Sequence, residues 1–176
     1  MLKMTTVYLS LGSNMGERAE NIARAIGALG QHGVRVRQKS SLYETEPLEI
    51  KEQPWFLNCA IEAETELSPQ KLMETLLSIE RELGRERRVP KGPRLIDMDI
   101  LLYGSDIVKQ PGLEIPHPRM AERKFVLVPL AEIAGEADHP TAMMTIAEML
   151  EATADRSEVK RWPGNADSYP TVNEER

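Results

Sequence analysis

Two aspartates, Asp97 and Asp99, stand inside the apolar stretch GPRLIDMDILLYG, which runs from Gly92 to Gly104. Glycines bound the stretch and it is too short for a helix, so it predicts a strand. Residues two apart on a strand leave the same face, which places both carboxylates on one side. At about 6 Å, two ionised carboxylates repel by about 2–3 kcal/mol at an effective dielectric constant near 20. A divalent cation would neutralise the pair, and oxygen ligands at this spacing suit magnesium.

A cluster of basic residues precedes these aspartates in a chain whose net charge is -6. It consists of Arg81, Arg85, Arg87, Arg88, Lys91 and Arg94. Guanidinium groups bind phosphate oxygens through paired hydrogen bonds. Metal-binding acids beside phosphate-binding bases favour a nucleotide site. For the aspartates alone, an acidic outer face of an edge strand is the simpler alternative.

Composition limits the class of protein. With 176 residues, 41% of them hydrophobic, we expect one soluble domain over residues 1–162 and a flexible polar tail over residues 163–176. The net charge argues against a general nucleic-acid binder. The single cysteine, Cys59, allows no disulfide within the chain and is typical of a small buried hydrophobe. No apolar run approaches a membrane span and no secretory signal is recognisable, so we expect a cytoplasmic protein that binds no membrane. We also expect a monomer.

Further elements must position the aspartates. Hydrophobic periodicity predicts strands over residues 5–11, 34–43 and 56–65, and helices from the turn GSNMGE to Gly30 and from Ser68 to Gly84. Ser68 caps the second helix, and either Asn14 or Ser13 caps the first. The turn before the first helix also offers backbone amides to a phosphate, although a plain capped turn explains it as well.

The order strand, helix, strand, strand, helix, strand predicts an α+β fold with two helices on one face of an antiparallel sheet. Phe56 and Asn58 share a face of the third strand, and we expect them on the open face with the aspartates, where a ligand binds. The loop over residues 44–54 is rich in proline and charge and is long enough to be a lid. Beyond the aspartate strand we expect a short hairpin over residues 103–115, a helical turn near Met120 and a final helix over residues 145–154.

Six segments in order carry a family resemblance: LGSNMG, SSLYETEPL, QPWFLNCA, IERELGRER, GPRLIDMDILLYG and IPHPRMAERKFVLVPL. On these segments the chain, up to about Ile133, resembles the 6-hydroxymethyl-7,8-dihydropterin pyrophosphokinases of folate biosynthesis. The resemblance implies a ferredoxin-like antiparallel sheet with a C-terminal extension. It also implies transfer of the β,γ-diphosphate of ATP to the hydroxymethyl oxygen of the pterin, with release of AMP.

The resemblance also implies roles for individual residues. Asp97 and Asp99 are implied to bind two Mg²⁺ ions that accompany ATP, and to be catalytic together with Arg85 and Arg94. The implied ATP-binding residues are Arg85, Arg87, Lys91, Arg94, Ile100, His117 and Arg123. The implied pterin-binding residues are Asn14, Thr45, Leu48, Phe56, Asn58 and Phe125. The two phenylalanines are implied to stack on the ring, and Glu80 matches a functional position whose role the sequence leaves open.

Three positions depart from the pattern of the family. Lys91 stands where some members carry a tryptophan, Pro118 where others carry an aromatic residue, and Glu46 where others carry a proline in the lid. These departures concern the packing of ATP and the motion of the lid rather than the reaction.

Two other interpretations remain open at this point. A ferredoxin-like module that binds nucleic acid would use the phenylalanines to stack bases and the arginines to meet phosphates, although paired carboxylates on the same face repel phosphate. A nucleotidyltransferase would use the same pair of aspartates on another substrate and release pyrophosphate instead of AMP.

Overall fold

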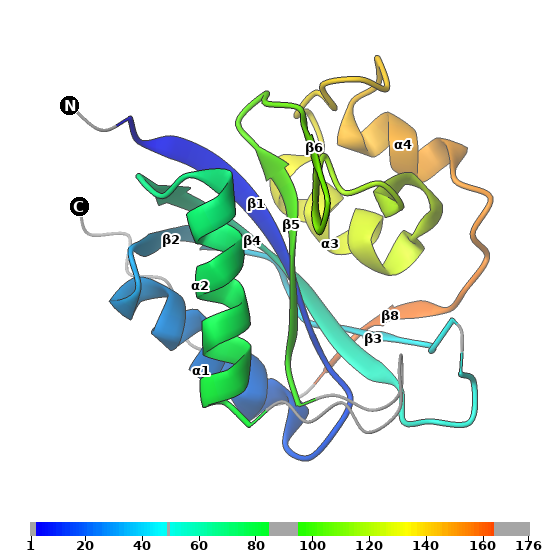
Figure 1. The fold of residues 1–176 in the computed structure, drawn as a ribbon. Coiled ribbons are helices and arrows are strands. Elements are labelled where there is room, and N and C mark those ends of the chain that lie inside the picture. The colour runs from blue at the N-terminus through cyan, green and yellow to red at the C-terminus, as the bar shows by residue number, and fades with distance from the viewer. Residues whose placement is uncertain (1–2, 49, 85–94, 164–176) are drawn as a thin grey trace.

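The structure, a computed structural model, describes residues 3–48, 50–84 and 95–163 (Figure 1). In this part of the chain six strands form an antiparallel sheet in the order β5-β1-β4-β3-β8, with β2 also paired to β4. The strands are β1 (Thr5–Ser13), β2 (Val34–Lys39), β3 (Tyr43–Thr45), β4 (Phe56–Thr65), β5 (Asp97–Tyr103) and β8 (Val159–Arg161). The central order β5-β1-β4-β2 is that of a ferredoxin-like sheet, so the predicted α+β fold is confirmed.

Helices α1 (Arg18–Gln31) and α2 (Pro69–Glu82) cover one face of this sheet (Figure 1). Alternate residues of β1 pack against the apolar stripes of both helices in one buried cluster. Its fully buried members include Val7, Leu9, Leu11, Ile22, Leu29, Leu72, Leu76 and Ile79. The Ser68 hydroxyl accepts a hydrogen bond of 3.2 Å from the Lys71 N–H, which confirms the predicted cap of α2.

The predicted start of α1 is wrong. The helix begins after Glu17 without a side-chain cap, and it continues past Gly30 to Gln31. Ser13 belongs to β1, and Asn14 donates its side-chain hydrogen bonds to the segment before β4. The turn GSNMGE therefore contacts the sheet, a neighbouring loop and, through the Asn21 side chain, the first turn of α1.

The strand predicted over residues 34–43 is divided into β2 and β3. Between them the Ser40 hydroxyl accepts a hydrogen bond of 2.9 Å from the Ala60 N–H, in place of a backbone carbonyl. The Ser41 N–H then turns away from the sheet and donates to the Glu132 carboxylate at 2.7 Å. The Ser40 side chain takes the place of a backbone acceptor and so interrupts the hydrogen-bond ladder with β4. The alternation of polar and apolar residues gives no sign of this interruption.

The second face of the sheet is partly covered, contrary to the prediction that it stays open. Helix α3 (Lys124–Ala134) packs on it, and α4 (Ile146–Ala152) packs on α3. The hairpin β6 (Val108–Gln110)–β7 (Leu113–Ile115) and the short turn η1 (Met120–Glu122) precede them. The sequence indicated the hairpin, the turn near Met120 and the last helix, but neither α3 nor β8. The run VLVPL is apolar on all sides because α3 lies between the sheet and α4, which hides the helical period.

None of the helices in the described ranges is long and apolar enough to cross a membrane. Apart from Pro163, the predicted tail lies outside the described residues, and so does the start of the aspartate stretch from Gly92 to Arg94.

Candidate active site

Strand β1 forms the floor of the candidate site. Gly12 pairs with Asn58 of β4 on one side and with Asp97 of β5 on the other, while Ser10 pairs with Asp99. Neighbouring strands lie about 4.8 Å apart, so Asn58 and Asp97 stand about 10 Å apart across the sheet. Both aspartates lie on the face that points away from α1 and α2, as the alternation on β5 predicted.

Asn58 is held tightly in this floor. Its side chain is 4% exposed, and its Nδ2 donates a hydrogen bond of 2.7 Å to the Thr45 hydroxyl. Its Oδ1 lies over Gly12, where an added Cβ would be only 2.4 Å from that oxygen. The Asn58 amide can occupy this position only because residue 12 has no side chain.

Two aromatic side chains reach this floor from different elements. Phe56 is the first residue of β4, and Phe125 lies in the first turn of α3. The Arg123 guanidinium lies 5.7 Å from the centre of the Phe125 ring, in range of a cation–π interaction. Both rings line the same cavity, so the missed helix α3 is the element that brings Phe125 to the aspartate face.

The cavity has a volume of about 160 Å³. It is lined by Ser10, Gly12, Thr45, Glu46, Pro47, Leu48, Gln53, Phe56, Asn58, Asp97, Asp99, Arg123 and Phe125. Carboxylates, amide groups and two aromatic rings therefore line one space. Such a cavity suits a flat polar heterocycle that can stack on aromatic rings and form hydrogen bonds at its edge.

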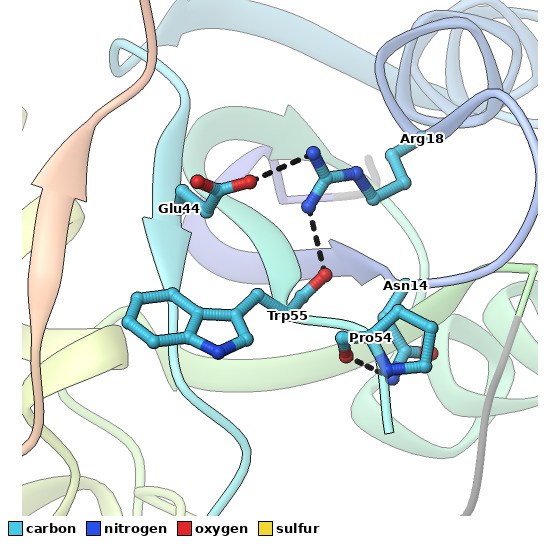
Figure 2. A network of polar contacts seen from close by, with 5 residues as sticks. All are labelled: Asn14, Arg18, Glu44, Pro54 and Trp55. Carbon is cyan, nitrogen blue, oxygen red and sulfur yellow. Dashed lines mark hydrogen bonds and ion pairs between the residues drawn. The ribbon is translucent and has the colours of Figure 1, made fainter. Parts of the chain in front are cut away.

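A polar network holds the end of the loop over residues 46–55, of which residue 49 is outside the described part (Figure 2). Arg18 of α1 donates hydrogen bonds of 2.8 Å to the Trp55 carbonyl and to the Glu44 carboxylate. The Asn14 amide donates to the Pro54 carbonyl at 3.0 Å and to the Gln53 side chain at 2.9 Å. These contacts hold the end of the loop next to Phe56, and we name residues 46–55 the pocket loop.

His117 lies beside the site. Its backbone N–H donates to the Leu101 carbonyl at 3.0 Å. The ring Nδ1 accepts from the Arg119 backbone N–H at 3.2 Å, so in the neutral ring the proton is on Nε2. Burial and the nearby charge of Arg123 lower the pKa of His117 to about 4, although Asp97 acts in the opposite direction. The ring is therefore a neutral donor at pH 7.

The structure brings some of the predicted site residues together and places others elsewhere. Thr45, Leu48, Phe56, Asn58, Asp97, Asp99, Arg123 and Phe125 line one cavity. Asn14 is not among the lining residues and contacts the pocket loop instead, and Ile100 is buried on the α1 and α2 side of the sheet. Predicted residues Arg85, Arg87, Lys91 and Arg94 lie outside the described residues.

Glu80 has a role that sequence reasoning left open. Its side chain is 2% exposed, and its Oε1 accepts a hydrogen bond of 2.8 Å from the N–H of Met98, the residue between the two aspartates. A carboxylate four residues after Leu76, on the buried stripe of α2, is the sequence signal that points to such a contact. Glu80 therefore supports the aspartate strand from behind.

The aspartate pair fits a magnesium ion by its chemistry. Asp97 and Asp99 supply only carboxylate oxygens, and in the described ranges no cluster of three or more His, Cys, Asp or Glu side chains is present that could hold a metal ion. Magnesium is commonly bound by one or two carboxylates, with water and substrate phosphates as the remaining ligands. The donor set thus suits an ion that arrives with a nucleotide.

Comparison with known proteins gives a family match. Residues 8–135 match the family model described as 7,8-dihydro-6-hydroxymethylpterin-pyrophosphokinase (HPPK). A 2-amino-4-hydroxy-6-hydroxymethyldihydropteridine pyrophosphokinase of Bacillus subtilis is 43% identical over 88% of this chain and 89% of its own length. The protein of the same name from Methylorubrum extorquens is 48% identical over 74% of this chain and 84% of its own length.

Longer relatives contain a similar segment. The folic acid synthesis protein fol1 of Pneumocystis carinii is 45% identical over 85% of this chain, which spans only 20% of that protein. A crystal structure of wild-type Plasmodium falciparum HPPK-DHPS superposes with a TM-score of 0.68 at 16% identity, over 85% of this chain and 44% of that one. At that identity the superposition shows the shared fold.

Proposed function

The chain belongs to the 7,8-dihydro-6-hydroxymethylpterin-pyrophosphokinase family, and we propose that it transfers the β,γ-diphosphate of ATP to the hydroxymethyl group of 6-hydroxymethyl-7,8-dihydropterin in folate biosynthesis. In this reaction the hydroxymethyl oxygen bonds to the β-phosphorus. The bond from the β-phosphorus to the oxygen that bridges it to the α-phosphorus breaks. AMP leaves with that bridging oxygen, and the hydroxyl proton is released to water.

The observation that carries the proposal is the single cavity that holds both aspartates, Asn58 and both phenylalanines. In the proposed complex the pterin lies between Phe56 and Phe125, with its edge at Asn58. The distance of about 10 Å from Asn58 to Asp97 leaves room for the ring and its hydroxymethyl arm, which then points toward the aspartates. Thr45 and Leu48 close the ring side of the cavity, while Asn14 acts through the pocket loop.

Asp97 and Asp99 are the proposed ligands of the two Mg²⁺ ions, which when bound neutralise the phosphate charge and polarise the β-phosphorus. Arg123 and the neutral His117 are proposed to bind phosphate oxygens, together with the predicted residues Arg85, Arg87, Lys91 and Arg94. Phosphoryl transfer needs mainly positioning and charge neutralisation. This chemistry therefore requires no protein nucleophile.

The direct test is incubation of the protein with ATP, magnesium and the reduced hydroxymethylpterin, with product analysis over time. We expect one AMP for each pterin diphosphate, and no AMP when either substrate is omitted. Release of pyrophosphate instead would favour the nucleotidyltransferase. Tight RNA binding in the absence of magnesium, without AMP formation, would favour the nucleic-acid module.

The aspartates give the first prediction. Asp97→Asn and Asp99→Asn each remove one negative charge from the proposed metal site without a change in side-chain size. We expect kcat to fall at least 100-fold, or about 2.7 kcal/mol, with a melting temperature close to that of the wild type. Asp106→Asn, on the exposed turn after β5, is the matched control. Normal turnover in either site variant would contradict the metal assignment.

A further inference from the structure

The segment over residues 153–161, here named the C-terminal strap, lies outside the ferredoxin-like core. It leaves α4, follows the edge of the molecule and ends as β8 beside β3 (Figure 1). Val159 pairs with Thr45, whose hydroxyl accepts the hydrogen bond from Asn58. The strap is thus the next strand outward from residues that line the cavity.

The strap holds the start of the pocket loop by two hydrogen bonds. The Glu46 N–H donates to the Glu158 carbonyl at 3.2 Å, and the Glu158 N–H donates to the Glu46 Oε1 at 2.9 Å. The carboxylate of Glu46 therefore continues the β3–β8 ladder by one step. Glu46 itself lines the cavity, as do Pro47 and Leu48 directly after it.

The other end of the strap holds the start of α3. The Asp155 Oδ2 accepts a hydrogen bond of 2.8 Å from the Lys124 N–H, the first residue of the helix and the neighbour of Phe125. The Asp155 Oδ1 accepts from the Ser157 N–H at 2.9 Å, which fixes the carboxylate. An acidic group at this place satisfies one of the open N–H groups of the helix.

A third contact reaches the end of the pocket loop. The Lys160 Nζ lies 5.9 Å from the centre of the Trp55 ring and forms an ion pair of 2.9 Å with Glu158. Trp55 directly precedes Phe56. The strap therefore contacts the pocket-loop wall of the cavity at Glu46 and at Trp55, next to Phe56. It contacts the other wall at Lys124, next to Phe125.

We propose that the C-terminal strap is a positioning element that sets the distance between the Phe125 wall and the pocket-loop wall, and so sets the affinity for the pterin without touching it. This inference depends on the proposed function, because the pterin is the ligand of that cavity. It assigns Asp155, Glu158 and Glu46 to one device. Release of either end frees one wall, and the ring then loses its fit between the two.

The test uses the full chain with Asp155→Ala, Glu46→Ala and the double variant. Pterin affinity is measured by fluorescence titration, and affinity for a non-hydrolysable ATP analogue is measured separately. We expect each single variant to raise the Kd for the pterin about 5- to 10-fold and to change the Kd for the analogue less than 2-fold. We expect the double variant to bind the pterin about as weakly as the weaker-binding single variant does. Release of one end of the strap is already enough to change the distance between the two walls.

Hydrogen exchange separates coupling through the strap from a local effect. We expect the peptide over residues 46–55 to exchange faster in Asp155→Ala, although the Asp155 carboxylate accepts its hydrogen bonds from Lys124 and Ser157. Glu46→Gln keeps an acceptor for the Glu158 N–H, so we expect it to recover most of the pterin affinity. Glu151→Ala, an exposed residue of α4, is the control and should leave the affinity and the exchange unchanged.

Three outcomes overturn the inference. Unchanged pterin affinity in Asp155→Ala and Glu46→Ala would show that the strap does not set the fit. Multiplied losses in the double variant would show two independent contacts. A wild-type chain that binds no pterin and forms no AMP would overturn the proposed function as well. If the wild-type chain does both, a negative result with the variants contradicts only the proposal about the strap.

Discussion

Gly12 shapes the floor of the cavity by having no side chain. A Cβ at this position would lie 2.4 Å from Asn58 Oδ1, well inside the closest approach of a non-bonded carbon and oxygen. Asn58 has little freedom to move away, because its Nδ2 is bonded to the Thr45 hydroxyl. We therefore expect Gly12→Ala to displace the amide, to raise the Kd for the pterin at least 10-fold, and to lower the free energy of unfolding by about 1–3 kcal/mol. A fluorescence titration and a urea melt measure the two effects.

A second glycine provides the matched control. Gly27 lies in α1, and an added Cβ would meet nothing within 4 Å. Because alanine is the better helix former, we expect Gly27→Ala to stabilise the protein by about 0.5–1 kcal/mol without a change in pterin affinity. If Gly12→Ala bound the pterin as tightly as Gly27→Ala, the Asn58 amide would not be a pterin contact.

His117 gives a prediction on pH. Its pKa is lowered from 6.5 to about 4 in the folded protein, first by burial and then by Arg123. Below pH 6.5 His117 therefore becomes protonated in the unfolded chain, whereas in the folded chain it stays neutral down to about pH 4. The stability from the neutral ring is fully present above pH 6.5, and we expect it to fall by about 1–3 kcal/mol between pH 6.5 and 4. Denaturant melts across this range measure the change.

His117→Asn is the comparison for that experiment. An asparagine oxygen can accept the Arg119 N–H in place of Nδ1, but it does not titrate. We expect the variant to show a flatter dependence of stability on pH between 6.5 and 4, since the other two histidines are unchanged. Identical slopes in wild type and variant would mean that His117 is not held neutral.

For single residues, the sequence predicts on which face of the sheet a side chain lies better than it predicts which side chains touch. A period of two was enough to place Asp97 with Asp99, and Phe56 with Asn58, on the cavity side, because a strand fixes the alternation. The bond from Asn58 to Thr45 and the close approach of Asn58 to Gly12 join residues of different strands. Only the register of β1 and β3 against β4 sets these pairs, and the chain gives no local signal for it.

Among the elements, α2 supports β5 through Glu80. The N–H of Met98 would otherwise be a buried donor, and an unsatisfied donor costs about 1–3 kcal/mol. We expect Glu80→Ala to lose that stability, to lower kcat about 10-fold and to raise the magnesium concentration needed for half-maximal rate, because both aspartates flank Met98. Steady-state kinetics over a range of magnesium concentrations measures the last effect.

Glu80→Gln distinguishes a role of Glu80 in positioning the aspartates from a role in the stability of the fold alone. The amide oxygen can still accept from the Met98 N–H, so we expect this variant to recover the magnesium dependence of the wild type. A Glu80→Ala protein with lowered stability but an unchanged magnesium dependence would show that the contact serves the fold alone.

The elements that sequence reasoning missed are those without a clear period. Helix α3 is apolar around its circumference and contains Pro129, so it has no polar face to reveal a helix. Strand β8 has three residues and pairs with β3, which is far from it in the sequence. In contrast β4 was predicted with its observed bounds, because ten alternating residues give a strong signal.

On the scale of the whole molecule, the cavity joins segments that are far apart in the sequence. Its walls come from β1, β3, the pocket loop, β4, β5 and the start of α3, so residues from 10 to 125 meet around one space. The resemblance could be recognised because each segment keeps its own short motif. The packing of α3 and the strap around the cavity depends on the complete fold, and that part was not predictable from motifs.

A ligand that contacts all these segments must stabilise the fold, because it binds the native state and not the unfolded chain. At a pterin concentration of 100 times Kd, we expect a gain of about 2.7 kcal/mol, which corresponds to a rise of about 5–10 °C in the melting temperature. Thermal melts with and without the pterin measure the shift. The same pterin concentration should shift the Gly12→Ala protein by several degrees less, because its Kd is higher, and should shift Gly27→Ala as much as the wild type. An equal shift in all three proteins would place the pterin outside the cavity, since only a ligand seated over Gly12 and Asn58 can distinguish them.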